Sequence, residues 1–141
     1  MKKIIGLRRL LLAASLFLPG IGFAAEAPTG LEPKVEGGVT YVSGGVDTTQ
    51  QQAIKEMRKD YNLQLLFALK GGAYLSDVKV KIQDSAGKSV LETVSSGPFL
   101  LARLPPGTYQ VTADFHGKAQ TRSAGVKSGG ISDLNFFWDK E

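Results

Sequence analysis

The sequence predicts a mainly β protein: a single antiparallel β-sandwich of about seven strands, with one N-terminal amphipathic helix packed on a sheet. Three observations predict this fold. Short apolar runs recur between residues 63 and 138, turn residues separate them, and several alternate apolar with polar residues. Runs of this spacing are typical of all-β domains, whereas only residues 48–61 have the spacing of an amphipathic helix.

The first 24 residues have the layout of a cleavable signal peptide. Residues 1–9 carry four cations, residues 10–18 are apolar, and Gly22 and Ala24 provide a small-x-small cleavage site. A membrane helix needs about 20 apolar residues, so the short run favours cleavage after Ala24 over a retained anchor. Arg8-Arg9 also suggests twin-arginine export, but no later motif resembles a cofactor site. We therefore expect a periplasmic or secreted protein with no integral membrane segment after cleavage.

Charge and cysteine content exclude several classes of partner and site. The whole chain has 17 Lys and Arg against 13 Asp and Glu, but four of the cations lie in residues 1–24. The remaining chain is therefore near neutral, with 13 residues of each sign, and no basic cluster predicts a nucleic-acid partner. The absence of cysteine excludes a lipoprotein anchor, a thiol nucleophile and a thiolate metal site.

Residues 25–38 are predicted to be a flexible linker, because they contain two prolines, three glycines and few apolar residues. Residues 39–141 are then expected to form one domain, which opens with the short β-prone run 39–42. A chain of this length buries about two thirds of its unfolded surface, which suffices without disulfides.

A helix is expected over residues 48–61. Asp47 or Thr48 is a suitable N-cap, and Gln50 or Gln51 follows three residues later, as in a capping box. Asn62 tolerates a left-handed conformation and is expected to end the helix.

The apolar stripe of this helix comprises Ile54, Met57 and Tyr61. Residues 63–69 and 131–138 are apolar on both faces, whereas a solvated sheet face is normally polar. We expect the helix to cover this second apolar surface by packing on Leu66, Ala68 and Phe137. The alternative is that this surface stays exposed as a partner-binding patch.

The expected long strands are residues 63–69, 78–82, 89–94, 99–104, 108–115, 118–126 and 131–138. Turn residues such as Asp84-Ser-Ala-Gly87 and Ser128-Gly-Gly130 separate them. The most specific corner is Leu104-Pro-Pro-Gly107, in which two prolines stiffen the backbone and Tyr109 follows two residues after the glycine.

Residues 75–115 resemble the carboxypeptidase regulatory-like domain, a transthyretin-like (prealbumin-like) sandwich. The resemblance rests on the 84–87 turn, on Gly97-Pro-Phe99, and on the 104–107 corner followed by Tyr109. The helix and linker are not part of the usual domain. Such domains are generally accessory modules, so the resemblance implies a non-catalytic module that binds a carbohydrate or another envelope protein.

No constellation in the sequence predicts catalysis, a cofactor or a metal. His116 is the one histidine and is expected in a hairpin turn, whereas a metal site needs three or four ligands. Ala86-Gly-Lys-Ser89 lacks the earlier glycine of a phosphate-binding loop. The alternative hypothesis is a small-ligand binder or an enzyme that uses Asp114, His116 and Arg122 at the end of the hairpin.

The residues expected to interact with a partner are two exposed aromatics, Tyr74 and Phe137, together with His116 and Arg122. Trp138 shares a face with Phe136, so we expect it in the core. The function that the sequence favours is therefore that of a non-catalytic periplasmic or secreted binding or protein-interaction module.

Overall fold

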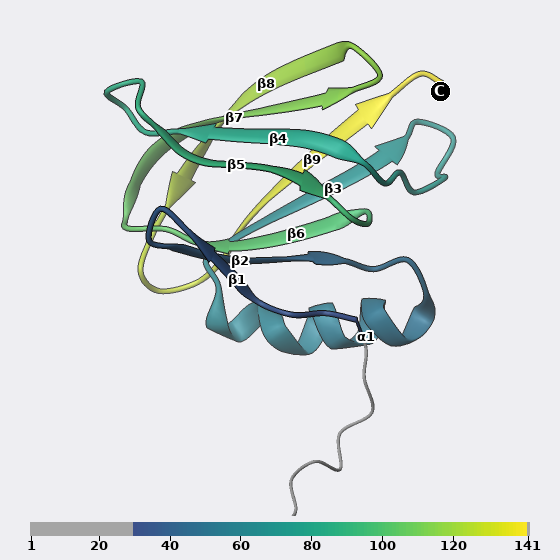
Figure 1. Cartoon of the computed structure of the whole chain (residues 1–141), viewed down its shortest axis with the longest axis horizontal. Helices are drawn as coiled ribbons and strands as arrows, with labels where there is room; N and C mark the ends of the chain where they lie inside the picture. The colour runs from purple at the N-terminus through teal and green to yellow at the C-terminus, as the bar shows by residue number, and fades with distance from the viewer. Residues whose placement is uncertain (1–29, 141) are drawn as a thin grey trace, which may run out of the picture.

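Two β-sheets and one short α-helix make up the protein in the computed structural model, which describes residues 30–140 (Figure 1). The predicted signal peptide, residues 1–24, and residues 25–29 of the predicted linker lie outside the described residues. Within the described part, the expected mainly β fold with two sheets and one short helix is confirmed.

One sheet has five strands in the order β1-β2-β6-β3-β9, and the other has four in the order β5-β4-β7-β8. The elements are β1 (Lys34–Glu36), β2 (Val39–Gly44), α1 (Thr48–Met57), the 3₁₀ turn η4 (Arg58–Asp60), β3 (Leu63–Leu69), β4 (Val78–Gln83), β5 (Ser89–Ser95), β6 (Phe99–Arg103), β7 (Gly107–Phe115), β8 (Lys118–Val126) and β9 (Ser132–Trp138).

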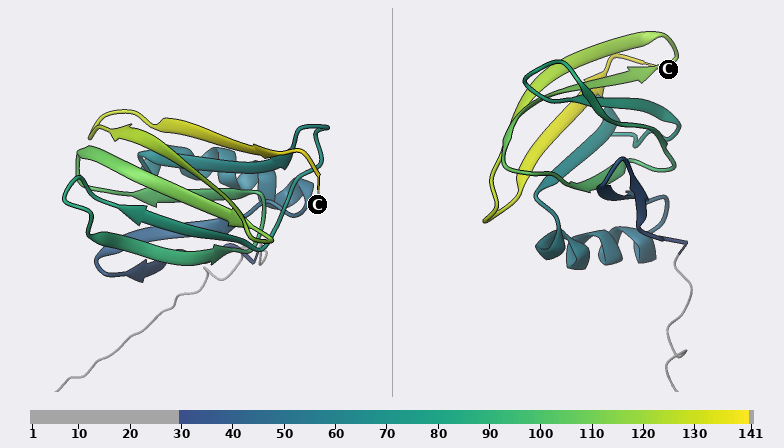
Figure 2. Two further views of the ribbon diagram at one scale, coloured as in Figure 1. Left: turned by 90° about the horizontal axis from the view of Figure 1, so that it is seen from above. Right: turned by 60° about the vertical axis from the view of Figure 1, so that its left-hand side comes forward.

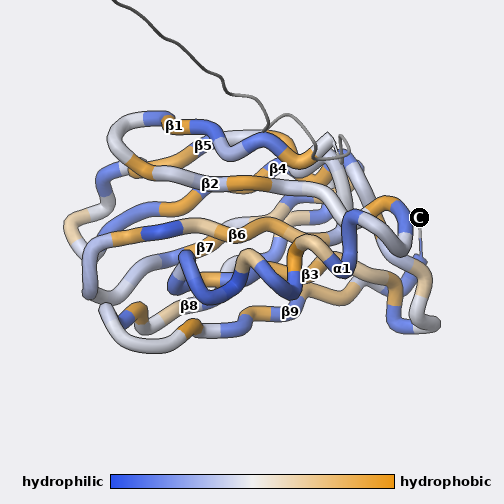
Figure 3. Tube along the Cα trace, turned by 90° about the horizontal axis from the view of Figure 1, so that it is seen from below, coloured by the Kyte–Doolittle hydropathy of each residue, from blue (hydrophilic) through white to orange (hydrophobic). Residues whose placement is uncertain are grey.

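The main hydrophobic core lies between the two sheets (Figure 2). In β4, Val78, Val80 and Ile82 are buried, and the lysines between them are exposed. The same alternation of apolar and polar residues runs along other strands (Figure 3). Because side chains on a strand point alternately to opposite faces, this pattern determines which face of each sheet is turned inward.

The predicted strand count and the purely antiparallel arrangement are both wrong. The described residues form nine strands rather than about seven, and β9 runs parallel to β3 from the pair Leu63–Ser132 to the pair Leu69–Trp138. The parallel pair arises because β8 ends on the edge of one sheet and the chain then crosses to the free edge of the other. Pairing across so long a separation is not encoded in local periodicity.

The predicted linker 25–38 also needs correction at its C-terminal end. Residues 34–36 form β1, which pairs with β2 in the register Glu36–Val39. Gly37 and Gly38 have φ of 58° and 85°, so they form the two-residue turn of a β-hairpin. The glycines that suggested flexibility are therefore the residues that this tight turn requires.

The start of α1 is as predicted. Asp47 is the N-cap, and its carboxylate accepts a 2.8 Å hydrogen bond from the Gln50 backbone N–H. The Gln50 side chain in turn accepts from the backbone N–H groups of Gly45 and Val46, which satisfies donors ahead of the helix. At the other end, Asn62 does not take the expected left-handed conformation, since Asp77 and His116 are the non-glycine residues with positive φ in the described chain.

The α1 helix covers the outer face of the five-stranded sheet, but on different residues from those predicted (Figure 1). Ile54 and Tyr61 pack with Val42 of β2 and Leu101 of β6. The expected partners Leu66, Ala68 and Phe137 are not in this cluster. The reason is the short 45–47 connection, which folds α1 back onto β2 and its neighbour β6, and so away from β9.

The Leu104–Gly107 corner carries the chain from β6 in one sheet to β7 in the other. Tyr109 is buried, and its hydroxyl donates a 2.6 Å hydrogen bond to the carbonyl oxygen of Pro105. A tyrosine that bonds to backbone a few residues upstream holds such inter-sheet corners in place.

Replacing Tyr109 with phenylalanine is expected to lower the free energy of unfolding by about 0.5–1.5 kcal/mol, the net contribution of one such hydrogen bond. Urea unfolding measures this change, with Tyr74→Phe as the control because Tyr74 is half exposed, at 51%. Equal stabilities of the two variants would contradict the role given to the corner hydrogen bond.

Candidate functional site

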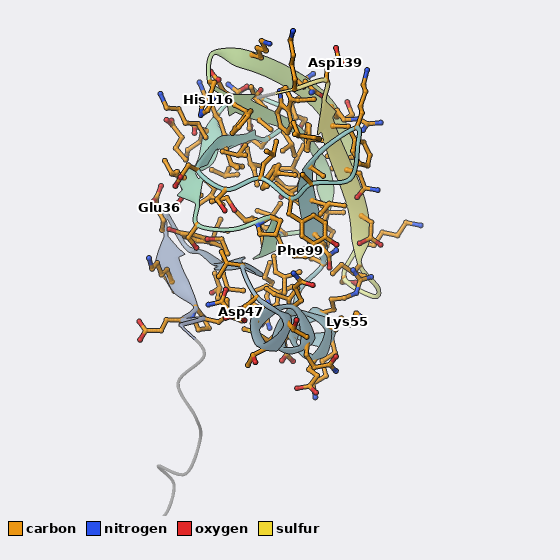
Figure 4. The ribbon with its side chains drawn as sticks, turned by 90° about the vertical axis from the view of Figure 1, so that its right-hand side faces the viewer. Glu36, Asp47, Lys55, Phe99, His116 and Asp139 are labelled. Carbon is orange, nitrogen blue, oxygen red and sulfur yellow. The ribbon has the colours of Figure 1, made fainter. Side chains whose placement is uncertain are left out.

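The predicted hairpin residues do not converge on one site. His116 is exposed in the β7–β8 turn with φ of 53°, and its ring stacks on Phe115. Asp114 accepts the backbone N–H of Gly117 and is paired with Lys79 and Ala119, whereas Arg122 is paired with the core residue Val111. Asp114 and Arg122 therefore lie on opposite faces of the hairpin. His116 lies at the end of the molecule away from α1 (Figure 4).

Arg122 instead bridges the two sheets, from β8 of one to β9 of the other. Its guanidinium donates to the carbonyl of Asn135 and lies 6.0 Å from the centre of the Phe136 ring. Two residues along β8, the Gln120 side chain donates a 2.6 Å hydrogen bond to the carbonyl of Phe137. Side chains of β8 therefore occupy backbone acceptors along the edge of β9, which would otherwise be open to another strand.

Removing both side chains, in the variant Gln120→Ala/Arg122→Ala, is expected to free the β9 edge for pairing with a second chain. Sedimentation velocity should then show dimers or larger species at concentrations at which the parent protein is monomeric. The variant Thr121→Ala/Ser123→Ala changes neighbouring exposed positions of β8 and serves as the control. If the Gln120/Arg122 variant sediments like the parent, these side chains do not protect the edge.

Tyr74 and Phe137 are exposed as predicted, at 51% and 42%, and they belong to one surface. Ala68 of β3 forms an antiparallel bridge with Tyr74 on one side and a parallel pair with Phe137 on the other. Directly paired residues point to the same face of a sheet, so the two aromatic side chains flank Ala68 on the outer face. Their backbones are two strand spacings apart, about 10 Å.

This surface continues towards the helix. Leu66, two residues before Ala68, is paired with Phe99 of β6, and the Phe99 ring meets Tyr74 edge-on with centroids 5.6 Å apart. Phe99 also packs against the cluster under α1 (Figure 4). We call Leu66, Ala68, Tyr74, Phe99 and Phe137 the aromatic face.

The helix therefore covers the outer face at Val42 of β2 and Leu101 of β6, with Phe99 at the border of that cluster. Tyr74 and Phe137 lie beyond it and are exposed. Whether these residues bind a partner stays a prediction.

Trp138 is in the core as predicted, and its ring N–H donates a hydrogen bond to the carbonyl of Lys118. Tyr41 of β2 is also buried.

A second feature, a cleft around Tyr61, was missed by the sequence analysis. Two adjoining hollows, of about 350 Å³ and 210 Å³, share Lys59, Tyr61 and Ser128 in their walls. They lie between η4, the loop before β9 and the end of β6. Arg103 closes one side, because its guanidinium donates to the Asp60 carbonyl and lies 5.9 Å from the centre of the Tyr61 ring.

Two ion pairs lie at this end and at the opposite end of the sheet. Arg58 and Asp133 meet at 2.7 Å, and their hydrogen bond raises the pKa of the Arg58 guanidinium. Lys70 and Asp139 also meet at 2.7 Å, and the hydrogen bond from Lys70 lowers the pKa of the Asp139 carboxyl. The Lys70–Asp139 pair is largely solvent-exposed and the Arg58–Asp133 pair is partly so, and ion pairs in such positions add little to the stability of the fold.

Burial raises the pKa of the Tyr61 phenol above its usual value near 10, against the opposing effect of the Arg103 charge. Burial also raises the pKa of Tyr109, with a further contribution from Asp84. Folding favours the protonated phenols, so their contribution to stability is complete below about pH 10 and is lost as the pH rises through the raised values. An ultraviolet titration should show that the tyrosines of the folded protein ionise at higher pH than those of the unfolded chain. Tyr61→Phe should remove the part of this delayed ionisation that comes from Tyr61. Coincident curves for the folded and unfolded chains would contradict this.

Residues 30–140 contain no group of three or more His, Cys, Asp or Glu side chains placed to hold a metal ion. Over the same residues, no helix is long and apolar enough to cross a membrane.

The comparisons with known proteins do not place the chain in a family. No family model matches the sequence, and no curated protein matches it. The similarity of residues 75–115 to the carboxypeptidase regulatory-like domain therefore remains a prediction from the motifs alone.

Proposed function

We propose that the protein is a non-catalytic binding module of the cell envelope, periplasmic or secreted, that recognises a partner protein through the aromatic face. The observation that carries this proposal is the row Tyr74–Ala68–Phe137, which places two partly exposed aromatic rings on one face of a rigid sheet. Exposed aromatic residues on a fixed scaffold are the type of side chain that dominates protein interfaces.

The chemistry of the aromatic face favours a protein over a carbohydrate. All five of its residues are apolar or aromatic. The polar side chains next to them are that of Asn135, which is paired with Leu66, and those of Lys70 and Asp139, which are bonded to each other. A sugar site needs several polar groups that fix the hydroxyls in addition to a stacking ring. A partner that packs an apolar surface over the exposed rings of Tyr74 and Phe137 needs none.

The proposed identity of the fold is a carboxypeptidase regulatory-like sandwich with an added helix. Support comes from the 104–107 corner, which joins the two sheets and is bonded by Tyr109 as this motif requires. The non-converging positions of Asp114, His116 and Arg122 support binding rather than catalysis, since a catalytic group needs its partners within hydrogen-bond reach.

The test begins with affinity capture from the envelope of cells that make the protein, followed by measurement of the Kd with the purified partner. The variant Tyr74→Ser/Phe137→Ser is expected to weaken binding by at least about 30-fold, because truncating one interface hot spot costs about 2 kcal/mol. Val94→Ser is the matched control, because Val94 is equally exposed, at 52%, but lies in β5 of the other sheet.

An unchanged Kd for the double variant would overturn the proposal. Binding to a purified glycan that depends on Tyr74 and Phe137, with no protein partner captured, would replace it with the carbohydrate alternative.

A further inference from the structure

The cleft around Tyr61 lies apart from the aromatic face and has an unusual chemistry, because its walls carry an excess of hydrogen-bond donors. Tyr61 is more than nine-tenths buried, with 8% of its surface exposed, and its hydroxyl has no hydrogen-bond partner among residues 30–140. Its hydroxyl lies at the cleft wall, where it can donate to or accept from a ligand. The hollows that Tyr61 lines are the space in which one could sit.

Two cations line the larger hollow together with Tyr61. Lys59 lines both hollows and forms no ion pair within the described chain. Arg103 lines the larger hollow and uses two of its three guanidinium nitrogens on the Asp60 carbonyl, which leaves the third nitrogen without a bond in the described chain. Arg58 is already neutralised by Asp133.

The loop between β8 and β9 adds further donors. Ser128 and Gly130 line the cleft, and Gly130 has φ of 104°. Within the described residues, the backbone N–H groups of 128–130 and the Ser128 hydroxyl form no hydrogen bond. Successive free backbone amides in a glycine-rich bend form a concavity that binds anions.

Against these donors, the one side-chain carboxylate in the walls of the two hollows is that of Asp60. We infer that this cleft binds a small ligand through an oxyanion group, a carboxylate, phosphate or sulfate. Lys59 and Arg103 supply the charge, and the Tyr61 hydroxyl and the 128–130 loop supply directional hydrogen bonds. The larger hollow, about 350 Å³, holds a ligand at the small end of the usual range.

The position of Tyr61 is held firmly enough for such a site. Its neighbour Asn62 is buried and bonds to the backbone of Leu104 on one side and to the carbonyl of Lys127 on the other. Asn62 therefore ties together the end of β6 and the start of the loop, the two walls that face each other across the cleft.

The test is a titration of the amide NMR spectrum with sodium phosphate, sulfate or acetate, with sodium chloride at the same ionic strength as reference. Saturable shifts are expected at the amides of Ser128, Gly129 and Gly130 for at least one of the three anions. Comparison of the three titrations identifies which oxyanion group the site prefers.

Lys59→Gln and Arg103→Gln are each expected to weaken this binding about tenfold, the loss that follows from one charge-assisted hydrogen bond. Lys81→Gln on the exposed face of β4 is the matched control. Tyr61→Phe keeps the packed ring and removes only the hydroxyl. It should therefore weaken anion binding, while the amide signals of the β-strands stay where they are in the parent protein, which shows that the fold is unchanged. Shifts that do not saturate, that chloride reproduces, or that persist in both charge variants would overturn the site. Because the aromatic face is not involved, failure here leaves the proposed partner binding intact.

Discussion

Replacing Asn62 with leucine is expected to lower the free energy of unfolding by about 2–5 kcal/mol, although leucine has nearly the same size. Asn62 accepts a 2.9 Å hydrogen bond from the Leu104 backbone N–H, and its amide donates to the carbonyls of Leu104 and Lys127 at 2.7 Å and 3.2 Å. Leucine leaves these buried groups without a partner, and each unsatisfied group costs about 1–3 kcal/mol.

Thermal unfolding measures this effect directly. A loss of this size in a domain of about 100 residues lowers Tm by more than about 10 °C. Asn135→Leu, at an exposed position of β9, is the matched control and should shift Tm by no more than about 3 °C. Equal shifts for the two variants would show that Asn62 does not join β6 to the loop before β9.

Replacing Ile54 with aspartate is expected to detach α1 from the five-stranded sheet. Ile54 is 2% exposed and packs with Val42 and Leu101, so a carboxylate there would be buried without a partner. The helix escapes that cost by undocking, and a helix of ten residues is not stable alone. The loss is therefore limited to the docking energy, about 3–5 kcal/mol for the apolar side chains that become exposed.

Hydrogen exchange distinguishes undocking from global unfolding. In Ile54→Asp, the amides of α1 should lose protection while those of β3, β4 and β7 keep most of theirs. Gln52→Asp adds the same charge on the exposed side of α1 and should leave the protection pattern unchanged. Helix amides that stay protected in Ile54→Asp would show that the contacts with Val42 and Leu101 do not hold α1.

Features set by neighbours in the sequence were predictable. Asp47 caps α1 because the chain places Gln50 three residues later, and β4 alternates because Val78, Val80 and Ile82 all point to the core. Gly37-Gly38 was interpreted as flexibility, although the same pair is also a hairpin-turn signal.

Long-range pairing could not be obtained from local spacing. β3 and β9 lie more than sixty residues apart in sequence, and no turn fixes their direction. One signal was present, since β3 is apolar on both faces, which is common in parallel strands. It predicted a covered surface, but not that α1 would cover β2 and β6 and leave part of β3 and β9 open.

The two candidate sites differ in the same way. The exposure of Tyr74 and Phe137 could be predicted because the strand pattern gives these large aromatic residues no place in the core. That they lie on one surface follows only from the pairing of both with Ala68. The cleft around Tyr61 is formed by three segments of the chain: η4, the end of β6 and the loop before β9. In the sequence, Tyr61 has the pattern of an ordinary core residue of an amphipathic helix. Its unsatisfied hydroxyl is visible only once the fold is known.

The aromatic face as a recognition surface is tested most directly by site-specific photo-crosslinking in cells that make the protein. A photoreactive amino acid at position 137 or 74 should give the same discrete adduct with one partner protein, and the same amino acid at position 94 on the opposite sheet should give none. Adducts that form equally from position 94, or none from positions 74 and 137, would contradict the account.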